Sequence, residues 1–243
     1  MAQSNVVLRL GSMMLTCGAG AYRVKSAMAR AAAAVGLDRH EAQVTMNEIV
    51  ASAFVGKERF RTVAVEQRRV GVNVDKLERL RTVVENLEAH ERVEDLNAKL
   101  DEVASVKPLY GAFANAAASG VACAGFCFLN KGGLYECLGV LIAAFLGQAL
   151  RRFLLHRGWQ HFVTWLLCGL LGSGTYMAVL AGMDLVGITD NTHQAGVISA
   201  ILFLIPGFPM VTAMLDMIRQ DFLSALTRMS YVIMVMAAAG IAV

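Results

Sequence analysis

The first stretch of the chain places apolar residues at the period of an α-helix. The apolar positions are Val6, Leu10, Met13, Met14, Cys17, Val24, Met28, Ala31 and Val35. Polar side chains fall on the opposite face, so the pattern predicts an amphipathic helix from Val6 to Val35. Gly18-Ala19-Gly20, in its middle, allows a bend or a close approach to another segment.

Gly36 ends this helix, and a different pattern follows it. Asp38 and Glu41 have the spacing of a capping box, in which each side chain satisfies a free backbone N–H of the first turn. The sequence therefore predicts a second helix from this point to about Asn47.

The period changes again after this point, first to that of strands and then back to that of helices. Runs of β-prone residues at Ile49–Val55, Phe60–Val65 and Val70–Val74 predict a small three-stranded sheet. Stripes of apolar residues at Leu77–Leu87 and Val93–Val103 then predict two helices with a phase slip between them. Together with the amino-terminal helices, these elements predict an α+β domain.

The second half of the chain is made of long apolar runs. They cover residues 111–129, 134–150, 162–183, 195–215 and 229–243, the last together with some preceding residues. Runs of this length are typical of helices that cross a bilayer. We therefore expect an α-helical polytopic membrane protein with about five transmembrane helices, in which residues 1–108 form the α+β domain and residues 109–243 form the transmembrane domain.

The fourth apolar run is broken by Pro206, Gly207 and Pro209, and Asp216 follows it. Proline removes a backbone donor and clashes with the preceding helical turn. A broken backbone facing lipid would leave polar groups without partners, so we expect this break to be buried in protein or to line a wet cavity. Broken helices of this kind form substrate sites in many transporters.

Charge separates the two halves of the chain. Residues 1–110 carry 30 of the 41 charged side chains, and the net charge of +3 is too small to indicate a nucleic-acid partner. Basic loops favour the cytoplasm. Arg151, Arg152 and Arg157 with Arg219 and Arg228 are therefore expected on the inner side. Asp184 and Asp190 are then expected outside, which makes the amino-terminal domain cytoplasmic.

Several kinds of chemistry find no support in the sequence. The five cysteines lack the spacing of a metal site, the Gly18-x-Gly20 pair lacks the third glycine of a dinucleotide fingerprint, and no phosphate loop is present. We expect no catalytic residues, no cofactor and no metal. Arg23, Asn47, Glu48 and Lys57 cannot be separated from ordinary surface residues.

Three segments carry a resemblance to a known family. They are Phe126–Gly133, the Leu204–Pro209 break with Asp216, Arg219 and Ala225–Arg228, and the stretches Gly11–Gly36 and Arg69–Asn73. Together they resemble the threonine/serine exporter family, over essentially the whole chain. In length and motif the chain is similar to the larger subunit of the bacterial two-component succinate exporter.

The resemblance implies a cytoplasmic domain followed by five membrane helices in the bacterial inner membrane. It also implies a partner, a small integral-membrane subunit, because fused family members carry both parts in one chain. Self-association is compatible with this arrangement. The cargo implied is a small carboxylate, either a succinate-type dicarboxylate or threonine and serine.

The candidate site residues each have a functional and a structural interpretation. Asp216 is the proton-coupling carboxylate, or it pairs with Arg219 or Arg228 at the membrane edge. The two arginines bind a substrate carboxylate, or they anchor the inner side. Asn130 and Lys131 contact the cargo or sit at the interface.

Two further candidates lie in the membrane half. Glu136 pairs with Lys131 or faces the pathway. At the break formed by Pro206, Gly207 and Pro209, freed carbonyls and amides contact cargo, or the segment is a simple kink.

Three functions remain open at this point. The first is a proton-coupled secondary exporter of small hydrophilic carboxylates, which works with its membrane partner and is not an enzyme. The second is a membrane-anchored enzyme, and the third is a regulatory or scaffolding subunit without a pathway of its own.

Overall fold

The computed structural model describes residues 2–56, 59–67, 71–187 and 194–243. They form two compact units, one of residues 1–107 and 207–230 and the other of residues 108–206 and 231–243. The first unit thus joins the amino-terminal half to a stretch that lies a hundred residues further along the chain. Lys57 and Asp190, both named in the sequence analysis, lie outside the described part of the chain.

The amino-terminal helical pattern forms two helices instead of one. Helix α1 is Ala2–Thr16 and α2 is Ala21–Ala34. Gly18, with a φ of +91°, turns the chain between them. This left-handed conformation is open to glycine at little cost, so the flexible tripeptide noted in the sequence is a full reversal and the single long helix is wrong.

The predicted helix at residues 38–47 is also wrong, because Arg39–Val44 is strand β1. It pairs antiparallel with β2, Glu48–Val55, which pairs antiparallel with β3, Arg59–Glu66. The Asp38 carboxylate accepts a hydrogen bond from the Gly56 N–H (2.5 Å) at the far end of β2 and so caps no helix. Pairing with a neighbouring strand outweighs the local capping signal here.

The sheet has three strands in the order β1-β2-β3, but its members differ from those expected. The segment expected as a third strand begins in residues outside the described part. Its described end, Gly71–Asn73, is an extended link whose Gly71 and Asn73 N–H groups donate to the Thr16 and Cys17 carbonyls (3.0 and 3.1 Å). The link therefore satisfies carbonyls at the end of α1.

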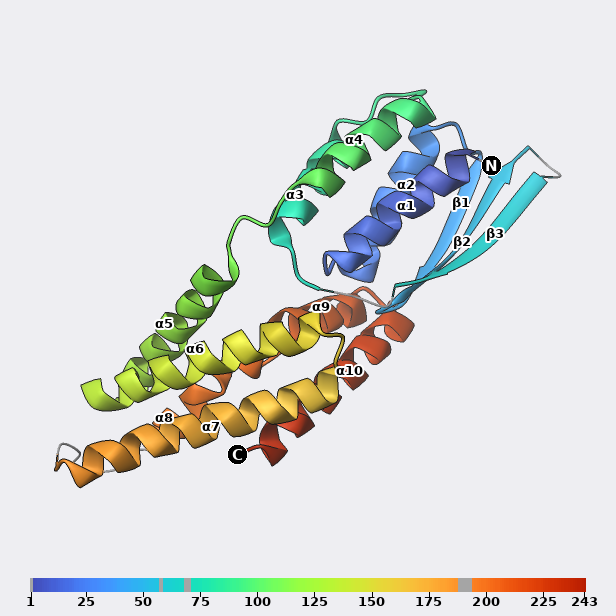
Figure 1. The fold of residues 1–243 in the computed structure, drawn as a ribbon. Helices are drawn as coiled ribbons and strands as arrows, with labels where there is room; N and C mark the ends of the chain where they lie inside the picture. The colour runs from blue at the N-terminus through green and yellow to red at the C-terminus, as the bar shows by residue number, and fades with distance from the viewer. Residues whose placement is uncertain (1, 57–58, 68–70, 188–193) are drawn as a thin grey trace. The chain divides into compact units, whose positions relative to one another are not determined.

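Helices α1 and α2 lie between the sheet and the pair α3 and α4, as Figure 1 shows. Helix α3 is Val74–Glu85 and α4 is Val93–Ser105, close to the predicted stripes. The core between these layers is aliphatic, and its largest fully buried members include Leu10, Leu15, Met28, Ile49, Leu80, Leu96 and Leu100.

Four helices are long and apolar enough to cross a membrane: α5 (Ala112–Leu129), α6 (Leu134–His156), α7 (His161–Leu185) and α10 (Phe222–Ile241). The broken fourth run forms α8 (Gln194–Ala200), a 3₁₀ turn (Leu202–Leu204) and α9 (Gly207–Ile218). At 1.5 Å per residue, neither α8 nor α9 alone spans a bilayer. Among the described residues there are thus four single-helix candidate spans, where the sequence predicted about five.

Helix α6 is longer than its predicted span, which ended at Leu150. Arg151 and Arg152 therefore lie inside the helix, and the basic loop of the prediction is reduced to the few residues after His156. Arginine is a good helix former, so charge alone did not mark the helix end.

Candidate functional site

A buried ion pair lies where α9 meets α10. Asp216, near the end of α9, is 1% exposed, and Arg228, in the second turn of α10, is 3% exposed. Arg228 Nε lies 3.2 Å from Asp216 Oδ2. The turn between the helices, with Gln220 at a φ of +62°, brings the two side chains onto facing surfaces.

The Asp216 carboxylate is held by more than Arg228. Its Oδ2 accepts hydrogen bonds from the Ser224 hydroxyl (3.1 Å) and from the Ala21 N–H (3.3 Å). Ala21 is the first residue of α2, where free N–H groups and the helix dipole favour a negative charge. The carboxylate therefore has three partners, two from α10 and one from the start of α2.

The Arg228 guanidinium also reaches the amino-terminal helices. Its Nη2 donates to the Ala19 carbonyl (2.8 Å). A Cβ on Gly20 would lie 3.1 Å from Asp216 Oδ1, so the turn between α1 and α2 approaches the carboxylate as closely as glycine permits. The structure therefore places Arg228, and not Arg219, as the ion-pair partner of Asp216.

Two further contacts link α2 to the α9–α10 segment. Lys25 Nζ lies 2.6 Å from Asp221 Oδ2. The Arg219 guanidinium sits over the Tyr22 ring, 3.8 Å from its centroid, in cation–π geometry. Such a contact leaves the N–H groups of Arg219 at the ring edge able to bind another group.

A cavity of about 330 Å³ adjoins this ion pair. Its polar lining comes from Asp216, Arg219, Arg23 and Thr212, and its apolar lining includes Phe208. The volume is at the lower end of small-ligand sites. Two arginines beside one already paired carboxylate give the cavity an excess of positive charge, which suits an anionic ligand.

The described parts of two of the three resemblance segments meet at this cavity. A Cβ on Gly18 would lie 2.8 Å from the Gly71 carbonyl oxygen and 3.1 Å from Phe208 Cε1. The α1–α2 turn, the link before α3 and the start of α9 are therefore in contact. Burial raises the pKa of the neighbouring Cys17 thiol, which stays protonated and unreactive at neutral pH.

The proline–glycine break divides into two parts with separate roles. Gly207 and Pro209 lie in the first turn of α9, where a missing N–H costs nothing. Pro206 follows the 3₁₀ turn, where the Phe203 carbonyl accepts from Arg151 (2.9 Å) and the Leu204 carbonyl from Trp165 Nε1 (2.7 Å). These two freed carbonyls are bound by protein groups, as a buried break requires.

The remaining predicted residues lie in the other unit. Asn130 donates to the Phe126 carbonyl (2.8 Å), and Lys131 has a φ of +68° in the tight turn before α6. Glu136 is 5% exposed, and its Oε2 accepts from the Gly133 N–H (2.8 Å), which caps α6. Their part in transport stays a prediction.

Arg23 and Arg151 are the residues whose positions the sequence did not reveal. Arg23 lies on the polar face of α2, and nothing in its spacing distinguished it from the neighbouring surface cations. Arg151 is half-buried in α6 and lies over the Trp165 ring (4.4 Å to the centroid). An arginine directly after the predicted end of an apolar run was the available signal for its burial.

Comparison with known proteins agrees with this picture. A family model described as "Putative threonine/serine exporter" matches residues 5–243. The chain is 23% identical to "Probable succinate transporter subunit YjjP" of Klebsiella aerogenes over 229 residues, which cover 93% of this chain and 86% of that relative. It is 24% identical to the protein of the same name from Escherichia coli K12, with the same coverage. No solved structure matches.

Proposed function

Because the chain belongs to the threonine/serine exporter family, we propose that it is one subunit of an inner-membrane exporter for small carboxylates. The cargo is a succinate-type dicarboxylate or threonine and serine, and transport is coupled to protons. The observation that carries this proposal is the buried Asp216–Arg228 pair beside a cavity that Arg23 and Arg219 make positive. In this proposal the chain binds and moves its cargo and catalyses no reaction.

Cargo recognition is assigned to the arginines of the cavity. Guanidinium groups bind carboxylates through two parallel hydrogen bonds, which add geometric specificity to charge. Arg219 keeps its ring contact with Tyr22 while its N–H edge faces the ligand, and Arg23 approaches from α2. Thr212 supplies a hydroxyl to the same space.

Coupling is assigned to Asp216. A proton that binds its carboxylate removes the negative charge and leaves the buried Arg228 guanidinium without a counter-ion. A cargo carboxylate then takes the place of that counter-ion, because an unpaired buried charge is strongly unfavourable. Cargo and proton therefore bind together and leave together, after which Asp216 pairs with Arg228 again.

The names of the two relatives support a second component. Both are called subunits of a succinate transporter, and we extend this to the present chain as a small integral-membrane partner. The exposed apolar side chains of α5 and α6, such as Phe113, Val121 and Leu138, supply surface for lipid or for this partner.

The test is transport in proteoliposomes that contain the chain alone or with its candidate small subunit. We expect exchange of labelled succinate or labelled threonine, for one of these cargoes and only with both subunits. Absence of exchange of either cargo by correctly folded protein in every combination would remove the proposed function.

The coupling role is tested by Asp216→Asn, which keeps the shape and removes the titrating group. We expect net, proton-coupled export to be abolished while membrane insertion and cargo exchange persist, because the neutral amide mimics the protonated carrier. Asp101→Asn, at an exposed acid of α4, is the matched control and should leave export unchanged. Unchanged net export by Asp216→Asn would exclude this carboxylate from coupling.

A further inference from the structure

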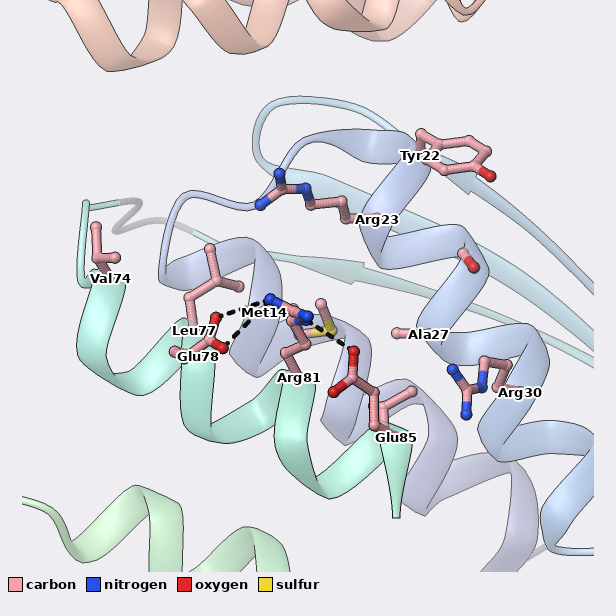
Figure 2. Close-up of a pocket in the computed structure, with 12 residues that line it drawn as sticks. Met14, Tyr22, Arg23, Ala27, Arg30, Val74, Leu77, Glu78, Arg81 and Glu85 are labelled. Carbon is pink, nitrogen blue, oxygen red and sulfur yellow. Dashed lines mark hydrogen bonds and ion pairs between the residues drawn. The ribbon is translucent and has the colours of Figure 1, made fainter. Parts of the chain in front are cut away.

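A second hollow lies on the same unit, between α2 and α3, with a volume of about 320 Å³ (Figure 2). We call it the α2–α3 groove. Its floor is apolar and buried, made by Met14 of α1 with Leu77 and Val84 of α3. Its rim carries five charged side chains: Arg23, Arg30, Glu78, Arg81 and Glu85.

The charged side chains on the rim differ in whether they have partners. Arg81 is bound on both sides, with Nε 2.8 Å from Glu85 Oε1 and Nη1 3.3 Å from Glu78 Oε1. Figure 2 shows this central bridge, with Arg23 and Arg30 on the opposite wall. Within the described part of the chain, neither of those two arginines makes a hydrogen bond or an ion pair.

The placement of the two unbound arginines defines the class of ligand. Arg23 and Arg30 are two turns apart on the exposed side of α2, about 10 Å along the helix axis. Between them the groove offers the apolar floor, the satisfied bridge and the Ser26 hydroxyl. An anion with one carboxylate at each end and a short hydrocarbon middle matches this order of positive, apolar and positive surface.

The groove also adjoins the cavity at Asp216. Tyr22, Arg23 and Leu77 line both spaces, while Arg30 lines only the groove and Arg219 only the cavity. Arg23 therefore stands on the shared wall, where its flexible side chain can hold a carboxylate in either space.

From this arrangement we infer that the α2–α3 groove is a loading site, which binds a small dicarboxylate before it enters the cavity at Asp216. The inference rests on the proposed function, because loading has meaning only if that cavity binds cargo. Removing the Arg30 charge weakens capture without touching the cavity, since Arg30 has no part in its lining.

Occupancy of the groove is measured on the full-length chain in lipid nanodiscs by protection of an engineered thiol. Ser26→Cys places the thiol in the groove, and Ala29→Cys places a control thiol on the exposed side of α2 outside it. We expect succinate to slow modification of the first thiol by a charged reagent and not of the second. Chloride at equal ionic strength should protect neither, and the unsubstituted chain gives the background of the native cysteines.

The same protection measurement in a chain that also carries Arg30→Gln tests whether Arg30 causes the protection. Loss of a charge-assisted hydrogen bond should raise the succinate concentration needed for protection about tenfold. Arg92→Gln, at an exposed arginine directly before α4, should change nothing. Equal protection by chloride, or protection that Arg30→Gln leaves unaltered, would overturn the site.

Exchange assays separate this inference from the proposed function. In proteoliposomes with both subunits, Arg30→Gln should raise the half-saturating succinate concentration about tenfold, and Arg92→Gln should not. Normal exchange with no protection in the groove overturns the loading site and leaves the exporter standing. Protection without exchange in any combination overturns both the loading role and the proposed function.

Discussion

Gly18 lies in a conformation and a contact that only glycine accommodates. Its φ is +91°, and an added Cβ would lie 2.8 Å from the main-chain oxygen of Gly71. The same left-handed conformation occurs at Gly56, with a φ of +66°, where an added Cβ would meet nothing within 4 Å. A comparison of substitutions at the two positions therefore separates the cost of the left-handed backbone conformation from the cost of the steric clash.

We predict that Gly18→Ala destabilises the protein more than Gly56→Ala. The control carries only the left-handed penalty of about 1 kcal/mol, whereas Gly18→Ala adds a clash with backbone and should reach about 3 kcal/mol. Thermal unfolding of both variants in detergent, against the unsubstituted chain, measures the difference. Equal unfolding temperatures for the two variants would mean that the α1–α2 turn accommodates the added methyl group without loss of stability.

The second prediction at the scale of residues concerns the buried pair. Arg228→Gln leaves the buried Asp216 carboxylate without its ion-pair partner, which should cost about 3–5 kcal/mol of unfolding free energy. The double variant Asp216→Asn/Arg228→Gln should recover much of this loss, because no lone charge remains. Denaturant unfolding of the four proteins gives the coupling energy.

The control for this cycle is Arg9, whose ion pair with Asp101 lies at the surface. Arg9→Gln should cost less than about 1 kcal/mol. If Arg228→Gln costs no more than that, the Asp216 site is open to water and the account of its burial is wrong. Sequence alone identified Asp216 as unusual, but it left Arg219 and Arg228 as equal partners. The choice depends on a turn that only the folded chain shows.

At the scale of elements, sequence reasoning succeeded where burial is one-sided and local. The stripes that became α3 and α4, and the run that became β2, were predicted because their period matches a single buried face. Strand β1 was missed because Asp38 and Glu41 have the spacing of a capping box, which favoured a helix there. What decided its conformation was the partner strand β2, a long-range contact that no local pattern contains.

The break in the fourth apolar run gives the element-scale prediction. Trp165 donates to the Leu204 carbonyl from a position 3% exposed, while Trp159 is 49% exposed. Trp165→Phe keeps an aromatic ring and removes the donor, so a buried carbonyl loses its partner, at a cost of about 1–3 kcal/mol.

Trp159→Phe is the matched control and should alter stability by less than about 0.5 kcal/mol. Thermal unfolding of the two single variants makes the comparison. Equal stability would mean that the Leu204 carbonyl finds another donor, and the 3₁₀ turn would then not depend on Trp165. The prolines revealed this break in the sequence, but not that Arg151 and Trp165 would bind its carbonyls.

At the scale of the whole molecule, the contacts of Asp216 constrain the membrane topology. Its hydrogen bond to Ala21 places residue 216 on the same side of the bilayer as the amino-terminal helices. The number of crossings between α4 and α9 must therefore be even. Helices α5, α6 and α7 supply three if each crosses, so the broken segment of α8 and the 3₁₀ turn must supply the fourth.

An even number of crossings before α9, followed by one crossing of α10, predicts that α10 ends on the side opposite the amino-terminal helices. Single cysteines at Ala104 and Arg157 should react with a membrane-impermeant maleimide on one side, and those at Val186 and Val243 on the other. The unsubstituted chain corrects for its native thiols, of which Cys17, Cys123, Cys127 and Cys168 are buried. Labelling of residues 104 and 243 from the same side would contradict the prediction. The broken segment would then enter and leave by one face, which is incompatible with the hydrogen bond between Asp216 and Ala21.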